Sequence, residues 1–202
     1  MRLYFSPGAC SLSPHIVLRE AGLKFDLEQV DLASKKTKAG ADFRQINPKG
    51  QVPTLQLDSG EILTEGPAIV QYLGDRKPET GLVPAAGTID RYRVQEWLNF
   101  ITSELHKGFT PLFKANTPDD YKKIARDNLA ERFGHLDRHL AGKQYLMGDR
   151  FTAADAYAFT VVNWSNFQKI DLAPWPNLKA YIARVAARPK VQEAMKAEGL
   201  IK

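Results

Sequence analysis

The sequence of 202 residues contains a single cysteine, Cys10, and no Cys-x-x-Cys pair. An internal disulfide and an internal redox dithiol are therefore both excluded. One cysteine fits a reducing compartment, so we expect a cytoplasmic protein. The N-terminus lacks a basic segment followed by an apolar run, and no apolar stretch is long enough to cross a bilayer. We therefore expect no secretory signal and no membrane partner.

The sequence also lacks a large excess of either charge. Its 28 Lys and Arg residues and 23 Asp and Glu residues give a net charge of +5. The basic residues are spread along the chain, so we expect no nucleic-acid partner, whereas an anionic small molecule suits the same excess. His135 and His139 have the spacing of a metal pair on a helix, but the sequence suggests no third ligand. We interpret both as surface residues and expect no metal.

Turn and helix signals predict an α/β unit in the first part of the chain. Its elements are strand 3–5, helix 14–21, strand 25–32, hairpin strands 54–57 and 61–63, and a helix opened by residues 64–67. A strand, a helix and a second strand imply a βαβ unit with a right-handed crossover. The order βαβ-ββα therefore predicts one domain over residues 1–80.

Helical signals alone follow a predicted linker at residues 81–87. Residues 89–109 have a strong 3.6-residue period, and Thr117-Pro118 followed by two aspartates starts a second long helix. Thr152 and Asp155 form a capping box before an apolar helix at residues 156–164, which we expect at the centre of its domain. We predict an all-α domain over residues 88–202.

Cys10 lies between the first predicted strand and the first predicted helix, which Ser13 caps and Pro14 begins. A thiol at a helix N-terminus feels the positive end of the helix dipole, and its pKa falls below the usual value of about 8.5. Cys10 is thus a candidate thiolate. The alternative is a small, buried apolar residue. Since the chain has no second thiol, any sulfur partner of Cys10 must arrive on a ligand.

Two dipeptides suit a peptide-like ligand. A cis bond at Val52-Pro53 would turn the backbone groups of Val52 outward to pair with an extended chain, and a strand-initiating proline is the alternative. Glu65-Gly66 stands at a helix start, where free N–H groups attract a carboxylate and Glu65 can receive an ammonium group. The alternative is that Glu65 is an acidic residue that simply caps the first turn of the helix. A ligand with an α-amino acid end satisfies both groups at this helix start.

A polar stripe on the predicted helix 93–109 contains Asn99, Ser103 and His106, with Lys107 beside it. Such a stripe is commonly a solvated face. The functional alternative is that it faces across a subunit interface into the partner's site. His106 would then exchange a proton or a hydrogen bond near a sulfur atom.

Taken together, several segments resemble the bacterial beta-class glutathione transferases, and the resemblance covers the whole chain. The matching segments are Ser6-Pro7-Gly8-Ala9-Cys10-Ser11, residues 47–53, residues 63–69, residues 97–101, residues 104–107 and residues 149–155. The resemblance implies a thioredoxin-like N-terminal domain, an all-helical C-terminal domain and a two-fold homodimer.

The resemblance further implies that glutathione, the co-substrate, is held mainly by the first domain, with a hydrophobic electrophile between the domains. By position, Cys10 contacts or covalently pairs with the glutathione sulfur. Val52 before a cis-Pro53 pairs with the cysteinyl backbone, and Glu65 with Gly66 holds the γ-glutamyl end. The other implied contacts are Lys35 at the glycine carboxylate and, partly across the dimer, Asn99, Ser103, His106 and Lys107.

Position 5 departs from the family pattern, because it holds Phe5 where relatives often carry a tyrosine. Tyr4 is adjacent but points to the other face of a strand. Thiolate stabilisation must then come from Cys10, the Ser11 hydroxyl, the helix N-terminus or His106.

Three functions follow as hypotheses. The leading one is conjugation of the glutathione thiolate to an electrophilic carbon. The second is thiol–disulfide exchange through a mixed disulfide between Cys10 and glutathione. The third is non-catalytic binding of hydrophobic ligands.

Overall fold

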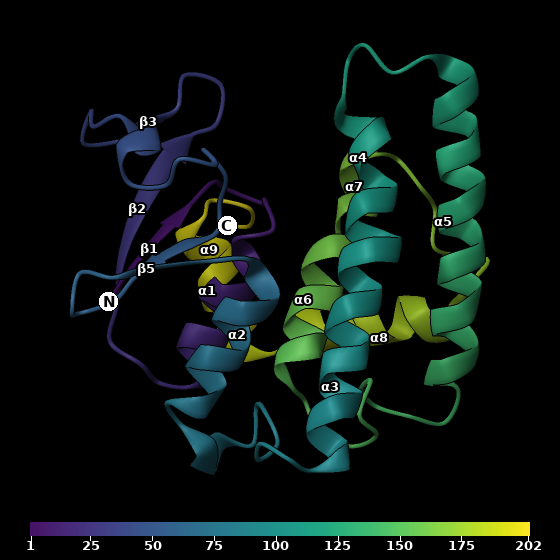
Figure 1. The fold of residues 1–202 in the computed structure, drawn as a ribbon. Helices are drawn as coiled ribbons and strands as arrows, with labels where there is room; N and C mark the ends of the chain where they lie inside the picture. Colours follow the sequence, from purple (N-terminus) through teal and green to yellow (C-terminus); the bar gives the residue numbers. More distant parts are fainter.

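The computed structural model describes residues 1–202, and its N-terminal part contains the only sheet (Figure 1). The elements of this part are β1 (Arg2–Phe5), α1 (Leu12–Glu20), β2 (Asp26–Asp31), β3 (Lys36–Thr37), β4 (Thr54–Gln56), β5 (Ile62–Thr64) and α2 (Gly66–Asp75). The strand order is β3-β2-β1-β4-β5. β1 runs parallel to β2, and the other neighbouring pairs are antiparallel. The βαβ-ββα prediction is confirmed, with β3 as a short additional edge strand.

The start of α1 differs from the prediction. Ser11 occupies the N-cap position, and the helix begins at Leu12 rather than at Pro14. Ser13, predicted as the cap, is buried inside the first turn. Pro14 still lies in that turn, where the missing N–H leaves no hydrogen bond unmade. Cys10 therefore immediately precedes the N-cap residue.

The C-terminal part is entirely helical, as predicted. It comprises α3 (Ile89–Phe100), the π-helical turn η3 (Ile101–His106), α4 (Lys107–Phe113), α5 (Asp119–Leu140), α6 (Ala153–Val162), α7 (Trp164–Phe167), α8 (Pro176–Ala186) and α9 (Pro189–Ala197). α3, η3 and α4 form one rod beside the antiparallel α5 (Figure 1). The predicted helix at 89–109 thus extends to Phe113 but contains a π-helical turn.

α6 is the central helix, because all ten of its residues are buried. The predicted capping box at its start is confirmed. The buried carboxylate of Asp155 accepts hydrogen bonds from the backbone N–H groups of Thr152, at 2.7 Å, and Leu146, at 2.8 Å, and from the hydroxyl of Tyr181 at 3.0 Å. These donors compensate for the removal of the charge from water.

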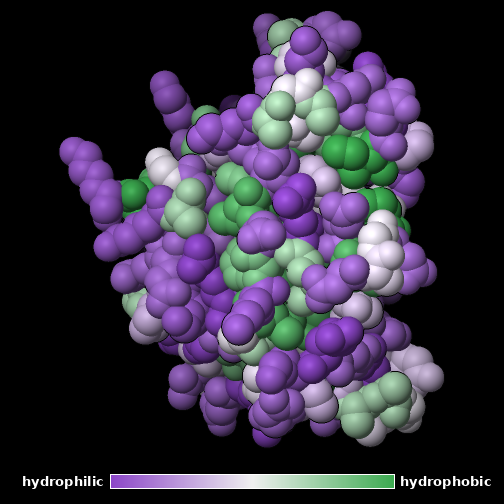
Figure 2. Space-filling view, turned by 90° about the vertical axis from the view of Figure 1, so that its left-hand side faces the viewer, coloured by the Kyte–Doolittle hydropathy of each residue, from purple (hydrophilic) through white to green (hydrophobic).

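One hydrophobic core runs through both parts of the molecule. α1 packs against α6 and against α9, so the last helix returns to the sheet-containing part (Figure 1). The division of the chain into domains at residues 1–80 and 88–202 stays a prediction. On the face that the N-terminal part presents, hydrophilic side chains surround a smaller central group of apolar ones (Figure 2). No helix combines the length and apolar character needed to cross a membrane.

Candidate functional site

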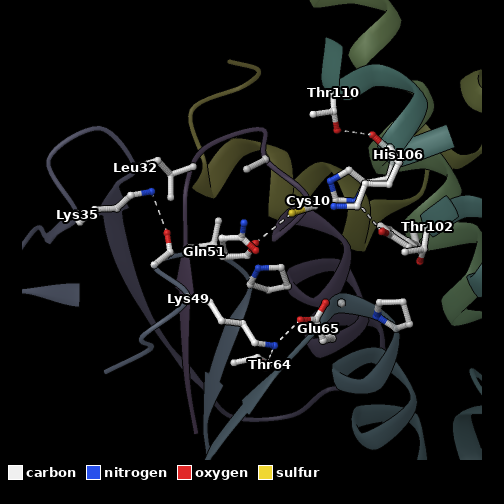
Figure 3. Close-up of a pocket in the computed structure, with 18 residues that line it drawn as sticks. Cys10, Leu32, Lys35, Lys49, Gln51, Thr64, Glu65, Thr102, His106 and Thr110 are labelled. Atoms are coloured by element: carbon white, nitrogen blue, oxygen red, sulfur yellow. Dashed lines mark hydrogen bonds and ion pairs between the residues drawn. The ribbon is translucent and has the colours of Figure 1, made fainter. Parts of the chain in front are cut away.

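A cavity of about 310 Å³ lies between the loops at one end of the sheet and the α3–η3–α4 rod (Figure 3). Loops of the N-terminal part form one wall, here called the sheet wall. Side chains of the rod and of α6 form the other, here called the helical wall. The cavity is lined by Ala9, Cys10, Leu32, Lys35, Lys49, Gly50, Gln51, Val52, Pro53, Thr64, Glu65, Gly66, Pro67, Thr102, His106, Lys107, Thr110 and Tyr157.

The thiol of Cys10 borders the cavity and donates a hydrogen bond to the carbonyl oxygen of Val52 at 3.2 Å. Burial raises the pKa of Cys10 to about 12, and the backbone N–H groups of Cys10 and Ser11 oppose this shift only partly. The predicted lowering of this pKa is therefore wrong. Desolvation outweighs the helix N-terminus, and Cys10 is a protonated thiol at neutral pH. Its partly buried side chain packs against the core, as the alternative reading expected, and it also borders the cavity.

Val52 and Pro53 both line the cavity, and the bond between them is cis, as predicted. The loop before them is fixed by Asn47, whose side-chain amide donates to the carbonyl of Gln51 at 2.8 Å and to the hydroxyl of Thr54 at 2.9 Å. Because Asn47 is buried, these hydrogen bonds fix the loop from the protein interior.

Charged side chains gather on the sheet wall. Lys35 donates to the carbonyl of Gly50 at 2.9 Å, and Lys49 binds the carboxylate of Glu65 at 2.5 Å and the hydroxyl of Thr64 at 3.1 Å. Glu65 occupies the N-cap position of α2 without making a side-chain cap bond, at φ +71°. Its carboxylate is engaged by Lys49 through Oε1, whereas Oε2 has no hydrogen-bond partner in the protein. Sequence reasoning missed Lys49, although this residue lies inside the Asn-Pro-Lys-Gly segment already singled out.

The helical wall presents Thr102, His106 and Thr110, which are spaced four residues apart. Nδ1 of His106 lies 2.7 Å from the hydroxyl of Tyr157, and the ring of Trp164 meets the imidazole edge-on at a centroid distance of 4.9 Å. Burial, aided by the charge of Lys107, lowers the pKa of His106 to about 4. The imidazole is thus neutral near pH 7, while burial raises the pKa of Tyr157. Tyr157 was not predicted as a site residue.

The structure brings eight of the predicted site residues to the cavity and leaves three outside it. Cys10, Lys35, Val52, Pro53, Glu65, Gly66, His106 and Lys107 line it, whereas Ser11, Asn99 and Ser103 do not.

Ser11 is fully buried, and its hydroxyl donates to the carbonyl of Ser6 and accepts from the N–H of the same residue. It therefore holds the loop together instead of facing a thiolate, contrary to the expectation for this hydroxyl. Asn99 and Ser103 are exposed and bond backward along the rod. Neither residue shares the cavity face with His106, because the i→i+5 bonds of η3 change the helical phase between Ser103 and His106. Their predicted contribution across a subunit interface stays a prediction. Thr102 instead shares the cavity face with His106.

Two family models match the chain. "Glutathione S-transferase, N-terminal domain" matches residues 8–76, and "Glutathione S-transferase, C-terminal domain" matches residues 100–189. Glutathione S-transferase GstA of Escherichia coli O157:H7 is 48% identical over 200 residues, which are 99% of this chain and 100% of that protein.

Solved structures agree with these matches over whole chains. A ternary complex of the bacterial protein BphK is 56% identical with a TM-score of 0.98, and covers 99% of this chain and 100% of its own. A sphingomonad glutathione S-transferase complexed with glutathione is 49% identical with a TM-score of 0.96, and a beta-class enzyme of Sphingomonas chungbukensis is 48% identical with a TM-score of 0.96. Both cover 100% of each chain. No cluster of three or more His, Cys, Asp or Glu side chains is placed to hold a metal ion.

Proposed function

Because this chain belongs to the glutathione S-transferase family, with beta-class enzymes among its relatives, we propose that it joins the glutathione sulfur to hydrophobic electrophiles beside Cys10. It is a glutathione transferase, and glutathione is its co-substrate. The positions that the cavity assigns to each part of glutathione, the electrophile site and the dimer are proposals.

One observation carries the assignment of the site: the thiol of Cys10 shares a single cavity with an acidic and a basic group. Lys35 and Glu65 lie on opposite sides of Gln51, and Cys10 faces the same space (Figure 3). Glutathione carries an ammonium and a carboxylate at its γ-glutamyl end and a second carboxylate at its glycine end. Glu65 suits the ammonium, the free N–H groups at the start of α2 suit the adjacent carboxylate, and Lys35 suits the glycine carboxylate.

The backbone of Val52 supplies the central contact of the proposed complex. An extended cysteinyl residue pairs with the N–H and C=O of such a segment as a strand pairs with an edge. In the free protein the Val52 carbonyl oxygen already accepts a hydrogen bond from the thiol of Cys10. A ligand N–H competes for that oxygen and frees the Cys10 S–H to turn toward the incoming sulfur.

Conjugation then proceeds by direct attack of the glutathione thiolate. The glutathione thiol loses its proton to solvent, its sulfur forms a bond to the electrophilic carbon, and the leaving group departs with the electron pair of its own bond. Cys10 donates its S–H to the glutathione thiolate, and the neutral imidazole of His106 supplies an N–H when its cavity-facing nitrogen is protonated. Both donors favour the anion over the thiol and so lower the pKa of bound glutathione.

The electrophile is proposed to lie against exposed aromatic rings next to the cavity. Phe113 and Phe167 are about half exposed, at 50% and 53%, and Phe113 packs edge-on against Trp164 at 5.4 Å. A Cβ atom built on Gly8 would lie 3.3 Å from the Phe167 ring, so this ring stands beside the loop that carries Cys10. Hydrophobic, planar substrates suit such a surface.

Thiol–disulfide exchange is the weaker reading. It requires a Cys10 thiolate, and burial holds the pKa of Cys10 at about 12. Non-catalytic binding has no observation in its favour, and GstA, which this chain matches over its full length, is a glutathione S-transferase.

The test is to compare the wild-type protein with Cys10→Ala in two reactions. With a chlorinated dinitrobenzene and glutathione, we expect Cys10→Ala to keep conjugation at a rate lower by about ten-fold, because one charged hydrogen bond is lost. Reduction of a glutathione mixed disulfide should be slow in both proteins. Fast reduction by the wild type alone, with no conjugation, would establish exchange instead.

We further propose a homodimer in the cytoplasm, with the domain boundaries at residues 80 and 88. Asn99 and Ser103 are exposed, and a shallow polar pocket between η3 and α5 contains Ser103, Arg132 and His135. These groups suit contact with a second copy of the chain. Sedimentation equilibrium at micromolar concentration should give twice the monomer mass, and a monomer mass would refute the dimer.

A further inference from the structure

Lys49 joins the loop before the cis peptide bond to the start of α2. Its backbone N–H donates to Oδ1 of the buried Asn47 at 3.1 Å. Its ammonium group donates to Oε1 of Glu65 at 2.5 Å and to the hydroxyl of Thr64 at 3.1 Å. Figure 3 shows the side chain of Lys49 directed toward Glu65 along the cavity. The lysine is therefore fixed both at its backbone and at its charged end.

The ion pair between Lys49 and Glu65 leaves one polar group of each partner unused. A lysine ammonium has three N–H donors, of which Glu65 and Thr64 occupy two. On Glu65, Oε1 is bonded and Oε2 has no partner. Both side chains line the cavity and are about half exposed or more, at 53% and 65%. The pair thus presents a free donor and a free acceptor side by side to a ligand.

The stability of the loop does not account for this ion pair. Pairs between exposed side chains contribute little, because water screens the charges and ordering two long side chains costs entropy. The loop is already fixed by the buried amide of Asn47, which donates to the carbonyl of Gln51 and to the hydroxyl of Thr54. A role toward a ligand explains better why Lys49 is held at this point.

The start of α2 offers a ligand carboxylate fewer donors than most helix starts. Pro67, the second residue of the helix, has no N–H, and the N–H of Ile69 already donates to the carbonyl of Glu65 at 3.0 Å. Free backbone N–H groups remain in this turn at Gly66 and Ala68. A carboxylate accepts about four hydrogen bonds through its two oxygens, so a further donor is needed there. Lys49, bonded to the N-cap residue, is placed to supply it.

We propose that Lys49 binds the carboxylate of the γ-glutamyl end of glutathione through its remaining N–H, while Oε2 of Glu65 accepts the neighbouring ammonium. This inference rests on the proposed place of the γ-glutamyl end at the start of α2. The two protein charges and the two ligand charges then alternate in sign, so each charge lies next to opposite ones. Lys49 does not need to leave Glu65, because the two cations use different oxygens of its carboxylate.

This arrangement selects ligands with a free α-amino acid end. A ligand without the carboxylate leaves the ammonium of Lys49 beside the ligand's own ammonium, with Glu65 as the only counterion. A ligand without the ammonium leaves Oε2 of Glu65 close to the ligand carboxylate. Either change places like charges together and should lower the affinity.

The test combines a change in the protein with a change in the ligand. Lys49→Met keeps the length of the side chain and removes its charge. Lys38→Met is the matched control, because Lys38 is exposed and does not line the cavity. Calorimetry gives the Kd of each protein for glutathione and for two analogues. γ-Aminobutyryl-cysteinylglycine lacks the carboxylate of the γ-glutamyl end, and glutaryl-cysteinylglycine lacks its ammonium.

For the wild type we expect each analogue to bind about thirty-fold more weakly than glutathione. Lys49→Met should raise the Kd for glutathione and for glutaryl-cysteinylglycine by about ten-fold, because both ligands keep the carboxylate. The Kd for γ-aminobutyryl-cysteinylglycine should change by no more than about two-fold, since the contact with Lys49 is already missing. Lys38→Met should bind all three ligands as the wild type does.

Two results for Lys49→Met would overturn the proposal. An unchanged or lower Kd for glutathione would show that Lys49 is a bystander or a competitor of the ligand ammonium for Glu65. An equal rise for glutathione and for γ-aminobutyryl-cysteinylglycine would show that Lys49 only orients Glu65. A different result would refute the proposed site itself: wild-type protein that binds both analogues as tightly as glutathione would place the γ-glutamyl end away from α2.

Discussion

The two walls of the cavity are built in different ways. The sheet wall consists of loops whose backbone and charged side chains, Lys35, Lys49 and Glu65, line the space. The helical wall consists of side chains, and it carries one positive group, Lys107, beside the neutral His106. One of its hydrogen bonds joins residues far apart in the sequence, since His106 and Tyr157 are separated by 51 positions.

The difference indicates a division of labour in the proposed complex. Fixed charges and backbone groups suit a ligand that is always the same, so the sheet wall should supply most of the affinity for glutathione. Neutral hydrogen bonds near the sulfur suit the stabilisation of an anion that appears during catalysis. Changes on the sheet wall should therefore alter binding, and changes on the helical wall should alter rate.

The largest expected effect, on the free energy of unfolding, comes from removing the buried carboxylate at the start of α6, the central helix that contributes Tyr157 to the helical wall. Asp155→Ala leaves the N–H groups of Leu146 and Thr152 and the hydroxyl of Tyr181 without their buried acceptor. We expect the free energy of unfolding to fall by about 3–5 kcal/mol, measured by denaturant unfolding. The control Asp120→Ala, in the exposed first turn of α5, should cost about 0.5 kcal/mol. Equal losses for the two variants would refute the structural role of Asp155.

The next effect in size belongs to the sheet wall. Glu65→Gln removes the carboxylate proposed to bind the ligand ammonium, so the Kd for glutathione should rise about thirty-fold, measured by calorimetry. Glu61→Gln, an exposed change just before β5, is the matched control and should leave the Kd unchanged. An unaltered Kd in Glu65→Gln would place the γ-glutamyl end elsewhere.

A smaller effect concerns pH and the helical wall. Burial lowers the pKa of folded His106 to about 4, below the ordinary value of about 6.5 in the unfolded chain. The unfolded state therefore binds more protons between these values, and stability should fall as the pH drops from about 6.5 toward 4. NMR titration of the imidazole checks the value, and His106→Gln should remove this contribution to the slope. A midpoint near 6.5 would contradict the burial argument.

The smallest expected effect is that of Tyr157→Phe, which removes one hydrogen bond from His106 and keeps the buried ring. We expect kcat to fall by about three- to ten-fold, with KM for glutathione unchanged, because the imidazole loses its orientation. A change confined to KM for glutathione would assign Tyr157 to binding. It would contradict the expectation that changes on the helical wall alter the rate.

The same contrast separates what the sequence predicts from what it does not. Val52, Pro53, Glu65 and Gly66 each lie at a local signal, a proline step or a helix start, so their place at the sheet wall follows from a few neighbouring residues. Tyr157 lies in a helix that reads as pure core, and nothing in that run marks one hydroxyl as pointing into a cavity.

Two further predictions failed, one because of the helical phase around η3 and the other because of the burial of Cys10. Thr102 and His106 are four residues apart and would share a face in a regular α-helix too. The separation of Ser103 from His106 depends on the π-helical turn η3, which a 3.6-residue period cannot reveal. The pKa of Cys10 was predicted from the nearby helix N-terminus alone. Desolvation by residues that only the folded chain brings together raises this pKa instead.

The central claim is that Cys10 stays a thiol while bound glutathione becomes the thiolate. Ultraviolet thiolate absorbance, followed from about pH 6 to pH 9, tests it directly because free glutathione ionises at the upper end of this range. The free wild-type protein should show no thiolate band. Glutathione should create one with a midpoint below that of free glutathione, and Cys10→Ala should retain a weaker form of it. A band in the free protein at neutral pH that disappears in Cys10→Ala would contradict the account.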